Sequence, residues 1–255
     1  MDMGLAGQVI VITGAASGIG RACALCALAE GADHLVLTDR NPAGLAQVAA
    51  QVPCASVLAD LADPAAAQSV IAAAIARFGR VDGLINAAGL TTRGSVATGS
   101  IEVWDSLFDV NARAPFVLMQ AAMADMLARK SAGAIVNILS MNAHCGAPDL
   151  GIYAATKGAM ATLTRNAASA HMADRIRVNG IHLGWVPTEA EDHMQAQVLG
   201  LGADWQARQA ARMPLGRMVS AAEAARLAIY LLGQASVPMS GALVDLEQYV
   251  AGAIG

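Results

Sequence analysis

The chain has few charged and few aromatic residues, and these scarcities limit what it can be. Only 14% of its 255 residues are charged and 4% are aromatic, whereas 56% are hydrophobic. Its net charge of −4 provides no attraction for nucleic acid or an anionic membrane. No apolar run reaches the ~20 residues of a membrane span. We therefore expect no nucleic-acid or membrane partner, and a partly apolar surface that favours a homo-oligomer, either a dimer or a tetramer.

Cysteine is also scarce, and the first residues lack the basic segment of a secretory signal. Four scattered cysteines are typical of a reduced protein, so we predict a cytoplasmic location. Cys23 and Cys26 form a C-x-x-C pair, but no second cysteine or histidine pair stands nearby to complete a zinc site. Their alanine- and leucine-rich setting favours a structural role. We expect no metal site.

Short β-branched runs alternate with helical stretches along the chain, beginning with the strand-like residues 8–13. This alternation predicts an α/β fold, a single Rossmann-like domain over residues 1–255 with a doubly wound parallel sheet of about seven strands. Residues 101–129 should form a long helical region that bends near Asn111 and Pro115. Residues 185–213 fit the alternation least, and such a long insertion is typical of a lid over a substrate site.

A glycine-rich segment, Thr13-Gly14-x-x-x-Gly18-x-Gly20, lies between the first predicted strand and the first predicted helix. Glycines permit a tight turn, and the helix N-terminus offers free N–H groups to a pyrophosphate. In this position the motif indicates a dinucleotide site. The residues predicted to contact the cofactor here are Gly14, Ser17, Gly18, Ile19 and Gly20.

Asp39 ends the second predicted strand, 19 residues after Gly20. A carboxylate at that position can accept hydrogen bonds from the adenosine ribose and would repel a 2′-phosphate. Residues 15–17 hold no basic side chain that could attract such a phosphate. The cofactor predicted is therefore NAD, with NADP less favoured. Arg40 favours NADP instead, since a guanidinium can bind a phosphate. The alternative interpretation of Asp39 is a solvated residue at the end of a strand.

Tyr153 and Lys157 stand four residues apart in a predicted helix, which places them on one face. A free tyrosine has a pKa of ~10 and is a poor acid or base at neutral pH. A nearby cation favours the phenolate, so the two residues together could transfer a proton. Such pairs also occur by chance on helix surfaces.

Taken in order, several motifs make residues 7–245 resemble the short-chain dehydrogenase/reductase family. The resemblance rests on the glycine motif, Asp60 after the third strand, Asn86-Ala87-Ala88-Gly89 after the fourth, Asn111, Ser140 thirteen residues before Tyr153, and Tyr153 with Lys157. Each motif alone is weak, but the ordered set is specific.

The resemblance implies that Tyr153 is the general acid/base and that Lys157 lowers its pKa and binds the nicotinamide ribose. Ser140 would hold the substrate oxygen, and Asn111 would hold a water that links Lys157 to solvent. Asn86 has an alternative role in tying neighbouring strands together. The remaining implied cofactor contacts are Asp60, Leu61, Asn86, Ala87, Ala88, Gly89, Tyr153, Lys157, Gly184, Val186 and Thr188.

The chain departs from the family pattern at two places. Leu183 precedes Gly184 where many members carry proline, and Asp245-Leu246-Glu247 replaces Asp-Gly-Gly. The second change leaves the floor of the substrate pocket open to question. Leu183 also lacks the fixed φ of proline and has an N–H that proline lacks.

The substrate walls are expected to come from the segment after Ser140 and from the lid. Their polar, acidic character suits a sugar or polyol better than a steroid or fatty acyl chain, although each residue could instead face solvent. His182 is expected to be a core histidine rather than a catalyst. The candidate substrate residues are Asn142, His144, Trp185, Glu189, Glu191 and His193.

Three functions remain open. The first is an NAD-dependent dehydrogenase of a secondary alcohol, sugar or polyol. The second is an NADPH-dependent carbonyl or 3-oxoacyl reductase. The third is a non-catalytic dinucleotide sensor, which the complete set of Asn111, Ser140, Tyr153 and Lys157 disfavours.

Overall fold

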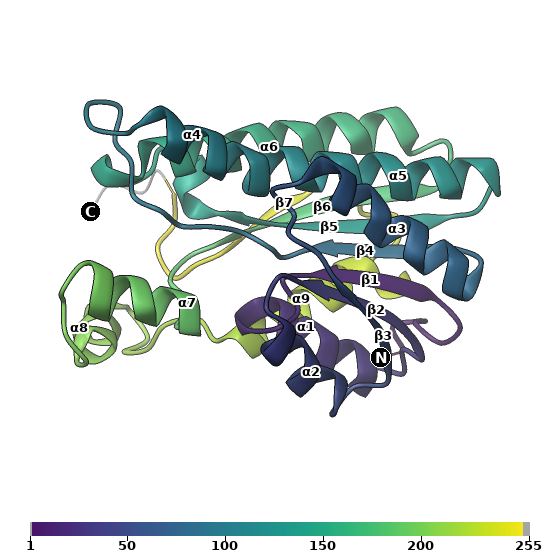
Figure 1. Cartoon of the computed structure of the whole chain (residues 1–255), viewed down its shortest axis with the longest axis horizontal. Coiled ribbons are helices and arrows are strands. Elements are labelled where there is room, and N and C mark those ends of the chain that lie inside the picture. The colour runs from purple at the N-terminus through teal and green to yellow at the C-terminus, as the bar shows by residue number, and fades with distance from the viewer. Residues whose placement is uncertain (1, 252–255) are drawn as a thin grey trace.

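The computed structural model describes residues 2–251 and contains one seven-stranded parallel sheet (Figure 1). The strand order is β3-β2-β1-β4-β5-β6-β7, so the order reverses between β1 and β4. This confirms the predicted doubly wound sheet. The strands are β1 Val9–Thr13, β2 His34–Asp39, β3 Cys54–Leu58, β4 Gly83–Asn86, β5 Gly133–Ser140, β6 Ile176–Leu183 and β7 Leu243–Leu246.

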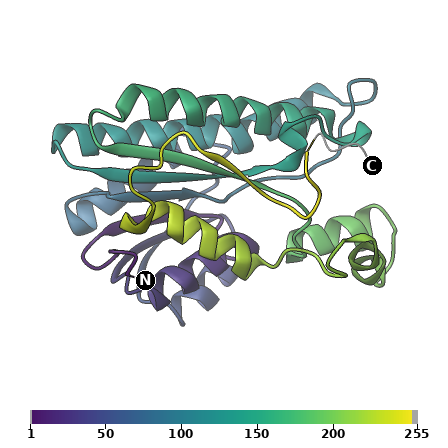
Figure 2. The ribbon, with the colours of Figure 1, turned by 180° about the vertical axis from the view of Figure 1, so that it is seen from behind.

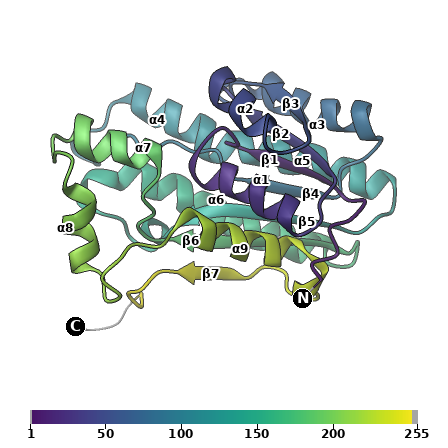
Figure 3. The ribbon, with the colours of Figure 1, turned by 90° about the horizontal axis from the view of Figure 1, so that it is seen from below.

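Helices cover both faces of the sheet, as Figures 1 and 3 show. One face carries α1 Gly18–Ala29, α2 Pro42–Ala49 and α9 Ala221–Leu232; the other carries α3 Pro64–Phe78, α4 Ile101–Phe108, α5 Ala114–Ala128 and α6 Gly151–His171. Alternate residues of a strand point to opposite faces. In β1, Val9 and Val11 therefore pack into one core, and Ile10 and Ile12 into the other.

The expected bend between residues 101 and 129 is a π-helical turn, Asp109–Arg113, inserted between α4 and α5. Asn111 lies at its centre and is buried. Pro115 lies in the first turn of α5, directly after the π turn, and lacks the N–H that other residues of a helix donate. Such single π turns are frequent at functional sites.

Residues 185–213 form a separate small unit at one end of the molecule (Figures 1 and 2). The unit contains α7 Glu189–Asp192, a π turn at His193–Val198 and α8 Trp205–Arg212. Buried Trp205 packs with Met213, Met218 and Trp185 in a small apolar cluster. The segment therefore has its own packed core.

The C-x-x-C pair of Cys23 and Cys26 lies within α1. Cys23 is buried in α1 as a free thiol whose pKa is raised by burial, which agrees with a structural role. Between residues 2 and 251, no helix combines the length and the apolar character needed to cross a bilayer.

Candidate active site

A cleft of about 810 Å³ opens at the carboxyl ends of the strands. In open α/β sheets this edge, near the point where the strand order reverses, is where ligands bind. The cleft is lined by Ser140, Tyr153 and Lys157 and by most of the predicted cofactor residues: Gly14, Ser17, Gly18, Ile19, Gly20, Asp39, Asp60, Leu61, Ala87, Ala88, Gly89, Gly184, Val186 and Thr188.

The glycine loop after β1 is held close to the loop after β4. Gly14 has a φ of +66°, and a Cβ there would lie 2.8 Å from the Cα of Ala88. Thr13 Oγ1 accepts hydrogen bonds from the backbone N–H groups of Ala87 and Ala88, at 3.0 and 3.1 Å. This leaves bare backbone and the N-terminus of α1 facing the cleft, which suits a pyrophosphate group. The residues present therefore fit a dinucleotide.

Asp39 lies at the carboxyl end of β2, on the wall of the cleft. Its Oδ2 accepts from the N–H of Ala16 at 3.0 Å, and its Oδ1 accepts from the N–H of Asn41 at 2.9 Å. The carboxylate thus fixes the glycine loop while it faces the cleft. Arg40 lines the same region.

Ser140, Tyr153 and Lys157 come together between β5 and α6. All three are buried, and the Lys157 Nζ lies 5.7 Å from the centre of the Tyr153 ring. Lys157 Nζ also donates to the carbonyl of Ile138 at 2.8 Å. The Ser140 hydroxyl oxygen accepts from the backbone N–H and from the side-chain Nδ2 of Asn142, each at 3.2 Å, so its own proton can be directed toward Tyr153 or a substrate.

Burial affects the pKa values of both members of this pair. Burial raises the pKa of Tyr153 to about 12, although a hydrogen bond with Ser140 acts in the opposite direction. Burial also lowers the pKa of Lys157 to about 8. The cause is desolvation, which disfavours the charged form of either group. Burial is therefore the largest influence on the pKa of either side chain, and the predicted effect of Lys157 on Tyr153 stays a prediction.

Two asparagines lie beside the cleft but do not line it. The Asn111 side chain pairs with the backbone of Leu90, accepting from its N–H at 2.8 Å and donating to its carbonyl at 2.9 Å. The Asn86 amide donates to Asn137 Oδ1 at 2.8 Å and so links β4 to β5. The side chain of Asn111 is thus occupied by the loop after β4, and the alternative, structural role of Asn86 is the one supported.

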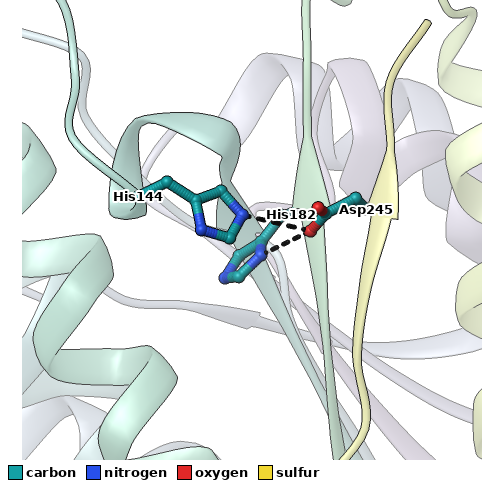
Figure 4. Close-up of side chains that lie close together, drawn as sticks. All are labelled: His144, His182 and Asp245. Atoms are coloured by element: carbon teal, nitrogen blue, oxygen red, sulfur yellow. Dashed lines mark hydrogen bonds and ion pairs between the residues drawn. The ribbon is translucent and has the colours of Figure 1, made fainter. Parts of the chain in front are cut away.

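The six candidate substrate residues separate into two groups. Four of them line the cleft: Asn142, Trp185, Glu191 and His193. Glu189 instead lies at the N-terminus of α1, where its Oε2 accepts from the N–H of Gly18 at 3.1 Å and its Oε1 pairs with Arg21. His144 points toward Asp245 on β7 (Figure 4). The geometry therefore gives no support to substrate roles for Glu189 and His144.

Two charged residues of the cleft, Arg93 and Glu247, were not among the candidate site residues. Arg93, in the loop after β4, pairs with Asp149 at 3.3 Å and with Glu191 at 3.7 Å. Glu247 packs directly against Gly184 and lines the pocket floor, in the segment that departs from the family pattern. No sequence motif has a spacing that would indicate Arg93. Glu247, in contrast, belongs to the segment Asp245-Leu246-Glu247, which differs from the family pattern in the sequence itself.

Comparisons with known proteins agree with this geometry. Residues 8–198 match the short chain dehydrogenase family. The inactive 2-(S)-hydroxypropyl-CoM dehydrogenase 2 of Xanthobacter autotrophicus is 36% identical over 84% of this chain and 93% of its own length. Sorbitol dehydrogenase of Cereibacter sphaeroides is 34% identical over 90% of this chain and 91% of its own.

A solved structure extends the similarity to the whole chain. L-sorbose reductase of Gluconobacter frateurii, in complex with NADPH and L-sorbose, has a TM-score of 0.92 at 28% identity and covers 100% of both chains. The matched family is one of dehydrogenases, and the L-sorbose reductase was solved with the nicotinamide cofactor NADPH. The chain therefore belongs to the short-chain dehydrogenase family.

Proposed function

We propose that this protein is an NAD-dependent dehydrogenase that oxidises a secondary alcohol of a polar, sugar- or polyol-type substrate. The observation that carries the proposal is the convergence of Ser140, Tyr153 and Lys157 in one cleft with the glycine loop. Fold similarity alone would not support a reaction. A buried acid/base side chain beside the nucleotide-binding edge of the sheet does support a reaction.

In the proposed mechanism, the Ser140 hydroxyl donates a hydrogen bond to the substrate oxygen and holds that oxygen beside Tyr153. The Tyr153 phenolate then accepts the hydroxyl proton as general base, and in reduction the phenol returns it. The residues that line the cleft would hold NAD, which would supply the hydride acceptor and, in its oxidised form, a positive charge. Because burial raises the pKa of Tyr153, we propose that Lys157 and the positive charge of an oxidised cofactor together stabilise its phenolate.

The choice of NAD rests on Asp39, whose carboxylate faces the cleft at the end of β2. A 2′-phosphate placed there would meet a negative charge. The rival is an NADPH-dependent carbonyl or 3-oxoacyl reductase, and Arg40, which also lines the cleft, is the observation in its favour. A non-catalytic dinucleotide sensor is the third possibility, and it would bind NADH without turnover.

The choice of a polar substrate rests on the cleft walls. Asn142, His193 and the Arg93–Glu191 pair supply hydrogen-bonding groups. Arg93 is shared between the carboxylates of Asp149 and Glu191, so its positive charge is already balanced and is not left over for an anionic substrate. Such a wall can bind hydroxyl groups without requiring a charged substrate.

A screen of secondary alcohols, aldoses and polyols with NAD⁺ and with NADP⁺, followed by NADH or NADPH absorbance, tests the proposal. We expect polyols to be oxidised with kcat/KM for NAD⁺ at least about tenfold above that for NADP⁺, since ~1.4 kcal/mol of repulsion at Asp39 produces that ratio. A preference for NADP⁺ would overturn the cofactor assignment. NADH binding with no turnover on any substrate would favour the sensor.

We also propose that residues 185–213 act as a lid whose Glu189 competes with the cofactor pyrophosphate. Glu189 occupies the positive end of α1, where it accepts from the Gly18 N–H and pairs with Arg21. Partial burial tends to raise the Glu189 pKa, but its hydrogen bonds, including those from Arg21 and Gly18, outweigh burial and lower it. The side chain is therefore an anion at the place where an anionic ligand is expected.

Substitution Glu189→Gln is expected to tighten NAD⁺ binding by roughly twofold to fivefold, the value of one charge at a helix N-terminus. The amide keeps the shape of the side chain but removes its negative charge. Isothermal titration with NAD⁺ measures the effect, and Glu30→Gln, beyond the other end of α1, is the matched control. Weaker binding in Glu189→Gln would show instead that the lid contact favours the loaded state.

Homo-oligomer formation stays a proposal, and an apolar groove between α5 and α6 supports it. The groove has a volume of about 360 Å³ and includes the exposed Phe116 and Leu127. A second copy of the chain covering these faces would remove that apolar surface from water. Sedimentation equilibrium measures the mass directly, and a monomer at micromolar concentration would contradict the proposal.

A further inference from the structure

Three potential metal ligands meet beside the active-site cleft. His144 lies just after β5, His182 lies in β6 and Asp245 lies in β7 (Figure 4). His182 Nδ1 is 2.8 Å from Asp245 Oδ1, and His144 Nε2 is 3.3 Å from the same oxygen. The two imidazole rings meet edge to face with their centres 4.6 Å apart. One nitrogen of each imidazole thus approaches the same carboxylate oxygen of Asp245.

The sheet register holds two of these residues in place. His182 pairs with Asp245 across β6 and β7, and with Leu139 across β5 and β6. His144 follows β5 by four residues and reaches back over the end of the sheet. The cluster therefore rests on a rigid base, with only His144 on a loop. Rigid elements position metal ligands more accurately than loops do.

The spacing of the donor atoms fits a transition-metal ion. All three lie within 4.8 Å of one another. Ligands about 2.0–2.2 Å from a tetrahedral Zn²⁺ stand roughly 3.4 Å apart, so small side-chain rotations would admit the ion. His182 is buried, so its imidazole is held in place by the surrounding sheet.

We propose that His144, His182 and Asp245 bind a divalent transition-metal ion of the Zn²⁺ type. Two imidazole nitrogens and one carboxylate oxygen suit Zn²⁺, Co²⁺ or Ni²⁺, whereas Mg²⁺ and Ca²⁺ prefer oxygen ligands. The side chains of His144 and Asp245 are 43% and 39% exposed, so water can reach the ion and complete its coordination.

The position of the ion indicates its role. It would join the loop after β5 to β6 and to β7, and so fix two walls of the cleft. His144 stands four residues after Ser140, and Asp245 stands two residues before Glu247; both Ser140 and Glu247 line the cleft. The site is therefore a structural clamp for the substrate pocket, and its existence does not depend on which substrate the enzyme uses.

The test is metal binding by the full-length chain, after treatment with a chelator and dialysis. The background is Cys145→Ser, because the exposed thiol next to His144 could bind metal by itself. We expect Zn²⁺ to bind with one ion per chain in isothermal titration and to raise the melting temperature. Co²⁺ should bind at the same stoichiometry. Its visible absorption spectrum should be that of a Co²⁺ ion bound by nitrogen and oxygen ligands.

Two variants should each weaken Zn²⁺ affinity by at least about 100-fold, since loss of an outer-sphere partner alone costs 10- to 100-fold. They are His144→Ala and Asp245→Asn, whose exposed side chains can be changed without disturbing the core; circular dichroism confirms their fold. The matched control is His171→Ala, because His171 also faces an aspartate, Asp174 at 3.0 Å. That control should leave Zn²⁺ affinity unchanged.

Several outcomes would overturn the proposal. Absence of saturable Zn²⁺ binding would mean that the three residues form only a hydrogen-bonded cluster. Equal affinity in the parent and in both variants would place the ion elsewhere, as would loss of affinity in His171→Ala. Intense charge-transfer absorption with Co²⁺ would reveal thiolate ligands and would also reject this site.

Discussion

Replacement of Tyr153 by phenylalanine is expected to lower kcat by roughly 10²–10⁴-fold, the range for removal of a general acid/base. The substitution deletes only the hydroxyl oxygen and keeps the ring that packs with Leu107, Leu150 and Ile152. The fold and the cofactor site should therefore survive. Steady-state kinetics on the best substrate from the screen measures the loss, and NADH fluorescence titration measures cofactor affinity.

The matched control for this prediction is Tyr230→Phe. Tyr230 lies in α9, and it packs on the core of the opposite face rather than lining the cleft. Its substitution should leave kcat within about twofold, as is usual for positions away from a site. Undiminished kcat in Tyr153→Phe would refute the acid/base role. A parallel loss of NADH binding would instead assign Tyr153 a role in holding the cofactor.

Replacement of Arg177 by methionine is expected to lower the free energy of unfolding by about 3–5 kcal/mol, the cost typical of breaking a buried charged network. Buried Arg177, at the start of β6, donates to the carbonyls of Leu231, Leu232 and Gly233 at 2.9 Å each. It also donates to Ser236 Oγ at 2.8 Å. The guanidinium thus satisfies carbonyls at the end of α9, where a positive charge also meets the negative end of the helix.

Methionine fills a similar volume but offers no donor, so several buried carbonyls lose their partners at once. Urea denaturation followed by circular dichroism measures the change. The control is Arg175→Met, because Arg175 is exposed and donates to the Lys130 carbonyl outside the core. That variant should stay within about 0.5 kcal/mol of the parent. A loss below about 1 kcal/mol in Arg177→Met would mean that water or local rearrangement can satisfy the α9 carbonyls.

Several features of the protein could be predicted because they depend on neighbours in the chain. Gly14 and Gly20 mark a turn that only small residues permit, and the spacing of Tyr153 and Lys157 follows from the helical repeat. Alternating β-branched runs likewise indicated the sheet. In each case the decisive interaction spans a few residues, so the pattern is visible in the sequence.

Other features depend on contacts between distant segments. Glu189 lies 171 positions from the Gly18 N–H that it accepts from, and Asp245 lies 63 positions from His182. No sequence pattern predicts contacts between residues so far apart in the chain. The sequence therefore suggested substrate roles for Glu189 and His144 that their contacts in the structure do not support. The π turn at Asn111 also needed the structure, because Pro115 offered an equally good cause of a bend.

The sequence by itself therefore determined the fold, the nucleotide loop and the positions of Ser140, Tyr153 and Lys157. Only the tertiary structure decided the electrostatics of that site and its surroundings. Burial raises the pKa of Tyr153 to about 12, and sheet register assembles His144, His182 and Asp245 beside it. The physical reason is that desolvation and side-chain proximity are properties of packing, and packing is set by contacts that local patterns do not specify.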